Sequence, residues 1–260
     1  MSPSTPQFTD RDLAGARFER CDLSGAVLRA VHVDGMEIDA PWLSEGEHGL
    51  VVNGVDVAAY VDSELDRRFP GRSLRTATDP GGLREAWVAV EAAWAAAVAR
   101  ATAMPPGTLE ASVDGEWSFT QTLRHLVMAT DVWLRQSVLG LEQALSPLGQ
   151  PHAEYATDGF DTSVFSHPDP SWDEVLEVRA DRQAQVTAFL ASVDATTLAQ
   201  PRPHPWAPPG SGVSEPVLAC LHTILGEEWE HLRFALRDLD ALDRSGEQPQ
   251  GRTGAPATRG

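Results

Sequence analysis

The residues best suited to chemistry are a glutamate and a histidine near the end of the chain. Glu227 and His231 stand four residues apart within "GEEWEHLRFALRDLDAL". Because a helix advances about 100° per residue, this spacing brings both side chains to nearly the same face. The pair can form an ordinary ion pair on the helix surface, or it can bind a cation together.

The surrounding residues favour an inward position for the glutamate of this pair. Leu221 and Ile224 belong to a broad apolar stripe that has Glu227 in its middle. Glu228 and Glu230 are expected to project sideways into solvent. A buried carboxylate must be paired or must bind a cation. Glu228 is the alternative ligand if the helix has a different phase.

A second histidine lies about 100 residues earlier, in the segment "TLRHLVMAT". Leu126 and Val127 belong to the apolar stripe of that segment, so we expect His125 at or near the edge of the buried face. A single buried histidine is more often a hydrogen-bonded structural residue. Two imidazoles and one carboxylate, however, form a common divalent-metal site with open positions for water or substrate. We therefore predict a metal site made of His125, Glu227 and His231.

The remaining histidines are not expected to join this site. His222 precedes His231 by nine residues, which places it on the opposite side of the helix. The others lie in the N-terminal repeat or in loops: His32, His48, His152, His167 and His204.

The predicted metal site needs helices that pack side by side. Ser118 and Ser171 each begin a helical pattern with a capping-box spacing. The region 140–170 is rich in glycine and proline and predicts a long loop, which is unusual unless it is functional. Residues 201–212 are expected to be irregular. The helical patterns cover residues 55–68, 80–102, 118–139, 171–192 and 214–242. Four long helices with one long connection predict a mainly α protein built as a four-helix bundle.

The N-terminal region has a different period. Neither a helix nor a strand repeats every five residues, whereas a square coil with one side per repeat does. The stretch resembles a pentapeptide repeat, a right-handed β-coil, and "ARFER" and "CDLSG" match its pattern at most positions. Seven repeats make fewer than two coils, so we expect this segment to lean on the rest of the chain as a docking or capping element. The residues in phase are Phe8, Leu13, Phe18, Leu23, Leu28, Val33 and Ile38.

The composition excludes several classes of function. Twenty basic and 38 acidic residues give a net charge of −18, which argues against nucleic acid and against anionic membranes as partners. No apolar run is long enough to span a bilayer, and no secretory signal is visible. Cys21 and Cys220 form no disulfide framework. We expect a cytoplasmic protein with reduced thiols.

Residues 50–243 resemble the DinB/YfiT-like family of helical metalloproteins. The resemblance rests on the order and spacing of "EWSFTQTLRHLVMATDVWL", "SWDEVLEVRADRQAQVTAFL" and "VLACLHTILGEEWEHLRFALRDLDAL". The family commonly takes one histidine ligand from the second bundle helix, which His125 matches, and an H-x-x-x-H pair from the last. Here Glu227 replaces the first histidine of that pair and His231 is the second. This Glu/His version is similar to the mycothiol-dependent maleylpyruvate isomerase branch, which binds zinc.

The resemblance implies an activity as well as a site. It implies a thiol-dependent S-transferase or isomerase that uses a divalent metal, zinc first, with nickel or iron as alternatives. The partners of such an enzyme would be an electrophile and a low-molecular-weight thiol such as mycothiol. The chain could also form a homodimer. Trp117, Phe160 and Trp206 could shape a substrate cleft or simply pack on the bundle. Arg237 and Asp238 are expected to pair structurally.

Two other interpretations remain open at this point. The chain could be a metal-binding domain without catalysis that uses the repeat as an adaptor. It could also be a purely structural bundle with a Glu227–His231 ion pair. The predicted organisation is a repeat segment at 1–45, a bundle at 50–243 and a disordered tail at 244–260.

Overall fold

The computed structural model describes residues 6–43, 46–208 and 210–246. The chain divides into two compact units, Met1–Ala40 and Pro41–Gly260. The predicted end of the repeat segment at residue 45 lies outside the described residues. Most of the predicted tail, residues 247–260, lies outside them as well, while residues 244–246 belong to the last helix.

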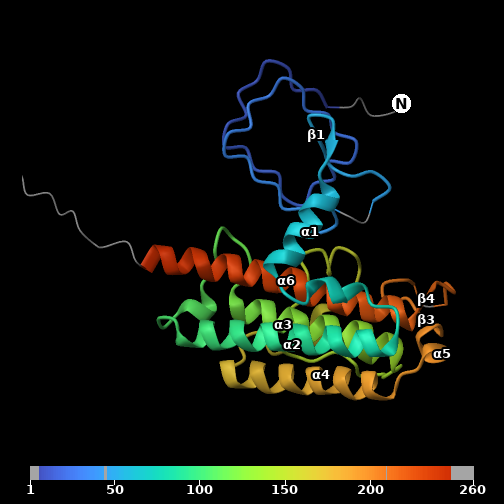
Figure 1. Ribbon diagram of the computed structural model, residues 1–260. Coiled ribbons are helices and arrows are strands. Elements are labelled where there is room, and N and C mark those ends of the chain that lie inside the picture. The colour runs from blue at the N-terminus through green and yellow to red at the C-terminus, as the bar shows by residue number, and fades with distance from the viewer. Residues whose placement is uncertain (1–5, 44–45, 209, 247–260) are drawn as a thin grey trace, which may run out of the picture. The chain divides into compact units, whose positions relative to one another are not determined.

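Four long helical segments of the second unit lie alongside one another (Figure 1). They are α2 (Pro80–Ala103), α3 (Phe119–Thr130) with its continuation η3 (Asp131–Val138), α4 (Trp172–Ser192) and α6 (Val217–Gly246). Helices α2 and α3 each pack against both α4 and α6. The described part of the chain is therefore mainly helical.

The core of this unit lies between these helices. Trp87, Val90 and Trp94 line the inner face of α2, and Ile224 and Leu232 line that of α6. Each of these side chains is almost fully removed from water, and burial of such apolar area is the main stabilising contribution. No helix within the described residues combines the length and the apolar composition needed to cross a membrane.

The helix starts follow from local sequence. Asp79 accepts hydrogen bonds from the backbone N–H groups of Gly81 and Gly82, with Pro80 in the first turn of α2. The capping boxes predicted at Ser118 and Ser171 are both present, at the starts of α3 and α4. These caps determine where α3 and α4 begin.

The structure differs from the sequence prediction in the helix of residues 118–139. From Asp131 onward the segment is a π-helix, and the N–H of Leu139 donates to the carbonyl of Leu134, five residues earlier. Such a π-helical stretch widens the turn and shifts the face that each side chain presents. Helical periodicity alone does not distinguish it from the α-helix that precedes it.

Two helix starts are also later than predicted, because short hairpins take up the first residues. Strand β1 (Val51–Val52) pairs with β2 (Val55–Asp56), so α1 begins only at Ala58 and spans Ala58–Arg68. Strand β3 (Pro201–Pro203) pairs with β4 (Ser214–Pro216), so α6 begins at Val217 and Ser214 is not its cap. The remaining short helices are η1 (Arg72–Thr76), η2 (Thr108–Glu110), η4 (Thr162–Val164) and α5 (Ala195–Leu198).

The first unit keeps the five-residue period in its backbone. A left-handed conformation recurs every five residues, with φ between 50° and 73°, at Asp10, Gly15, Arg20, Gly25, Ala30 and Gly35. Between these corners the chain turns through the square outline seen in blue in Figure 1. No strand is assigned among residues 6–40, so the predicted β character is not observed there.

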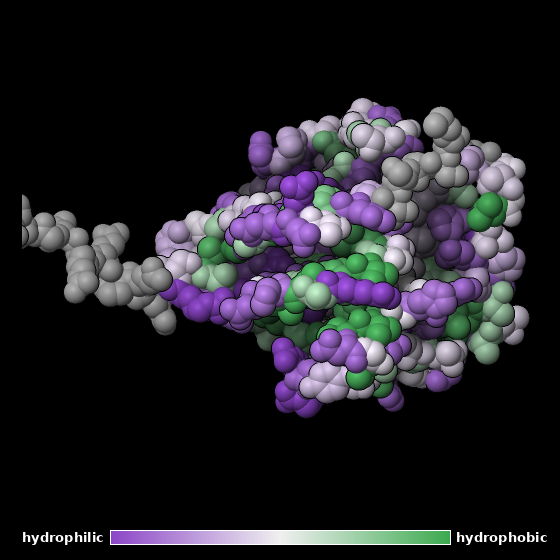
Figure 2. Space-filling view, turned by 90° about the horizontal axis from the view of Figure 1, so that it is seen from above, coloured by the Kyte–Doolittle hydropathy of each residue, from purple (hydrophilic) through white to green (hydrophobic). Residues whose placement is uncertain are grey.

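The apolar residues of the repeat are not buried. The seven in-phase side chains from Phe8 to Ile38 are 47–66% exposed. With fewer than two coils, stacked coils can cover each side chain on one side only. Figure 2 shows hydrophobic side chains at the surface between hydrophilic ones.

Candidate metal centre

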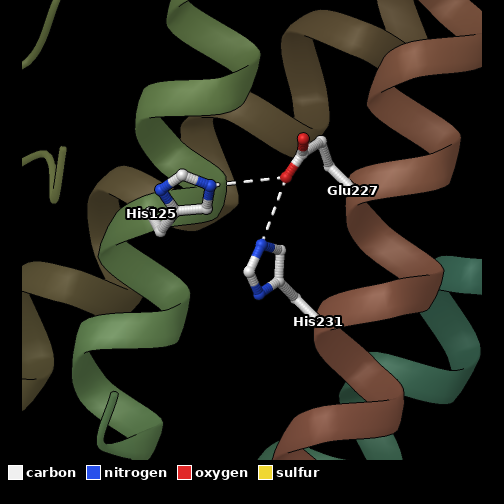
Figure 3. A group of neighbouring side chains, drawn as sticks. All are labelled: His125, Glu227 and His231. Atoms are coloured by element: carbon white, nitrogen blue, oxygen red, sulfur yellow. Dashed lines mark hydrogen bonds and ion pairs between the residues drawn. The ribbon is translucent and has the colours of Figure 1, made fainter. Parts of the chain in front are cut away.

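The structure brings the three predicted ligands together (Figure 3). His125 comes from α3, and Glu227 and His231 come from successive turns of α6, which packs against α3. The carboxylate oxygen Oε2 of Glu227 lies 3.3 Å from Nε2 of His125 and 3.2 Å from Nε2 of His231. One ligand atom from each residue lies within 4.8 Å of the other two.

A backbone carbonyl orients the imidazole of His125. Its Nδ1 lies 2.9 Å from the carbonyl oxygen of Gln150, in the loop after η3. A carbonyl can only accept a hydrogen bond, so we assign the proton to Nδ1. In the neutral ring, Nε2 then presents its lone pair to Glu227. Metal-ligating histidines commonly use their second nitrogen in this way.

The electrostatics of the group favour a carboxylate anion at Glu227 and a neutral imidazole at His231. Burial by itself raises the pKa of Glu227, but its contacts with the imidazoles of His125 and His231 outweigh this and hold the pKa well below its usual range. Burial lowers the pKa of His231, and the neighbouring Glu227 only partly offsets this. Carboxylate and neutral imidazole are the forms that bind metal ions.

The donor set fits a divalent cation. When His125 and His231 are neutral, a nitrogen lone pair that faces Glu227 Oε2 repels it, unless a proton or a metal ion lies between them. Two imidazole nitrogens and one carboxylate oxygen match the ligand preferences of zinc. No other group of three such ligands is found within the described ranges.

The site is open on the side of the carboxylate. The side chain of Glu227 is 33% exposed, against 9% for His125 and 15% for His231. Trp117 covers both imidazoles, with ring centroids 4.5 Å from His125 and 5.8 Å from His231. Trp117 therefore forms one wall of the site.

Phe160 and Trp206 pack against each other and against the helical core. Their rings lie 5.1 Å apart, and both pack edge-on or tilted against Tyr155. This arrangement corresponds to the packing alternative, in which the loop aromatics cover the helical core.

Two glutamates of α6 are less exposed than the sequence predicts. Glu228, expected in solvent, is only 1% exposed and forms an ion pair with Arg179 of α4. Helix α6 is flanked by neighbours on more than one face, so adjacent glutamates point to different partners: Glu227 faces α3, and Glu228 faces α4. Glu228 is therefore not the alternative metal ligand. Glu230 was also expected in solvent; its side chain is partly buried and pairs with Arg233.

A second buried charge cluster was missed altogether. Asp131, at the start of η3, is fully buried and pairs with Arg182 of α4 and Arg135. The spacing of Arg179 and Arg182 between buried positions of α4 was the available signal, because charged residues within an apolar stripe need buried partners. His222, by contrast, lies outside the metal site as expected and contacts the carbonyl of Ala77.

The expected structural pair near the end of α6 is present. Nε of Arg237 donates to Oδ1 of Asp238 at 2.7 Å. Arg237 also lies over the ring of Phe234, which in turn contacts His231.

Residues 89–235 match the DinB superfamily, and this range holds all three ligands and more than half of the chain. The chain belongs to the DinB superfamily. No curated protein and no solved structure matches it. Membership confirms the predicted family, while the pentapeptide character of the first 40 residues and the mycothiol-dependent branch stay predictions.

Proposed function

We propose that this DinB protein binds a divalent metal ion through His125, Glu227 and His231 and acts as a thiol-dependent S-transferase or isomerase. The observation that carries the metal site is the convergence of two Nε2 atoms on one carboxylate oxygen. Zinc is the first candidate, with nickel and iron as alternatives. We also propose that α2, α3 with η3, α4 and α6 form the four-helix bundle that holds it.

The proposed chemistry needs an activated sulfur. When bound, a divalent ion lowers the pKa of a coordinated thiol and makes thiolate available near neutral pH. In the chain itself, His125 and His231 offer uncharged donors, and Glu227 offsets part of the cation's charge. The partly exposed side chain of Glu227 gives a small thiol access to the site, and Trp117 shields the two imidazole rings from water.

The choice of thiol comes from the resemblance to the mycothiol-dependent branch. A low-molecular-weight thiol of that kind would attack an electrophilic carbon as thiolate. In a transfer reaction a C–S bond forms and the leaving group departs. In an isomerisation the thiolate adds and is later expelled.

The test of the metal site is elemental analysis of purified wild-type protein beside three alanine variants. His125→Ala and His231→Ala remove ligands, and His222→Ala is the matched control on α6. We expect about one metal ion per chain in the wild type and the control. We expect loss of the metal in both ligand variants. Wild type without metal, or retention in both ligand variants, would leave Glu227 and its two histidines as a structural hydrogen-bonded group.

A second candidate function is a non-catalytic metal-binding module with the first unit as an adaptor. The exposed apolar side chains of residues 6–40 favour it. Deletion of residues 1–45 followed by a pull-down tests it, since an adaptor would lose a specific partner. A metal-loaded protein that transfers no thiol from a panel of thiols and electrophiles would also favour this function over the enzyme.

A further inference from the structure

Arg124, the residue before the candidate ligand His125, is a buried cation with an unusual set of partners. Its Nε donates to the carbonyl of Leu148 at 2.7 Å, and its Nη1 donates to the carbonyl of Pro168, also at 2.7 Å. Both of these described bonds go to backbone carbonyls and not to a carboxylate. Burial lowers the pKa of Arg124, partly offset by Asp169, so this position costs free energy that its hydrogen bonds must offset.

Those two carbonyls belong to the two ends of one segment. Leu148 lies ten residues after the end of η3, and Pro168 lies four residues before the start of α4. One guanidinium therefore fastens both ends of the 148–168 segment to α3. The planar fork of arginine can hold two acceptors at once, which the single ammonium of lysine holds less rigidly.

The same residue also holds the part of the loop that touches the site. The backbone N–H of Gln150 donates to the carbonyl of Arg124 at 3.2 Å, and the side chain of Arg124 holds Leu148 two residues earlier. The carbonyl of Gln150 then accepts the hydrogen bond from Nδ1 of His125. Thus Arg124 holds the loop by two hydrogen bonds, one at Gln150 itself and one at Leu148, and Gln150 in turn orients the imidazole of His125.

We propose that Arg124 is a positioning residue for the metal site: it clamps the 148–168 segment so that the Gln150 carbonyl holds His125 with Nε2 facing Glu227. The inference rests on the proposed metal-binding function. The orientation of His125 by the loop, however, does not require a metal ion and can be measured in the metal-free protein. The clamp acts through the loop, and Arg124 itself touches neither Glu227 nor His231.

The experiment compares wild type with Arg124→Gln, Arg124→Lys and the control Arg72→Gln. Arg72 is also buried; its partners are Asp62 and Asp66 on α1 and, at 3.7 Å, Glu230 on α6, and none of them belongs to the loop. The first readout is the tautomer of His125 in metal-free protein, from long-range ¹⁵N–¹H correlation spectra. The second readout is the zinc Kd, from competition with a chromophoric chelator.

We expect the neutral His125 ring of the wild type and of Arg72→Gln to carry its proton on Nδ1. Arg124→Gln should shift the proton toward Nε2 and raise the zinc Kd by about 10- to 100-fold. Arg124→Lys should restore part of both. A partial rescue by lysine would indicate positioning of His125. The control Arg72→Gln shows the effect of a general loss of stability on the same two readouts.

Three results would overturn the inference. The first is an Nε2–H tautomer in the wild type, which needs no variant to fold. The second is an Arg124→Gln variant with an unchanged His125 tautomer. The third is an Arg124→Gln variant whose zinc Kd equals that of the control Arg72→Gln. Failure of the proposed function looks different: wild type binds no zinc, yet the tautomer still reports whether the clamp operates.

Discussion

The buried ion pair between Arg179 and Glu228 allows a sharp test of the packing around α6. Glu228 is 1% exposed, and its carboxylate meets the guanidinium of Arg179, which reaches it from α4. Oε1 of Glu228 and Nη1 of Arg179 have no hydrogen-bond partner among the described residues. The pair is therefore bound together but incompletely satisfied.

Removing one partner should cost far more than removing both. Glu228→Leu leaves a buried arginine without its carboxylate, and breaking such a pair costs about 3–5 kcal/mol. For a unit of this size that corresponds to a fall in Tm of roughly 6–20 °C. Arg179→Met should cost a similar amount. The double variant removes both desolvated charges, so its stability should lie near that of the wild type or exceed it by about 1–4 kcal/mol.

The assay is urea unfolding followed by circular dichroism, analysed as a double-mutant cycle. Asp243→Asn is the control, because Asp243 pairs with Arg100 at the surface and should change stability by at most about 1 kcal/mol. A double variant as unstable as the worse single variant would refute the reasoning. So would single variants that cost no more than the surface control, since that would mean that both charges reach water.

Three further predictions concern other parts of the chain. Ser118→Ala removes the oxygen that accepts from the N–H of Gln121, and we expect a loss of about 1 kcal/mol in unfolding free energy by urea titration. An unchanged midpoint would contradict this role of the cap. Arg67 and Arg68 hold the pKa of Glu64 at about 2, so their interaction stabilises the fold above the ordinary value of 4.5 and is lost as the pH falls toward 2. Replacing both arginines with alanine should move the NMR titration midpoint of Glu64 up toward 4.5, and a midpoint that stays in place would show that they are not its cause. Chelation should destabilise zinc-loaded protein by about 2.7 kcal/mol if free zinc was at 100 times Kd, or roughly 5–11 °C in Tm. Equal melting with and without chelator would count against the metal site.

The fold was predictable where local signals suffice. The capping boxes at Ser118 and Ser171 and the apolar stripes identified the long helices, because these signals involve residues within one or two turns. The hairpins at the starts of α1 and α6 were missed, since strand pairing depends on a partner segment and a two-residue strand has no periodicity to detect.

The candidate site was predictable to a similar degree. The four-residue spacing of Glu227 and His231 determines that they share a face, whatever the helix packs against. His125 could be named as a candidate from its edge position in an apolar segment. Nothing local indicated that its Nδ1 would be held by Gln150 or that Trp117 would cover both imidazoles.

The sequence by itself thus determined the helices, the pairing of Glu227 with His231 along α6 and the five-residue period of the first unit. Only the tertiary structure decided which glutamate faces which neighbour. Glu227 meets His125, 102 residues away, whereas Glu228 is buried against Arg179. The physical reason is that helical periodicity sets the angles between side chains on one helix, while burial depends on which other helices occupy those directions.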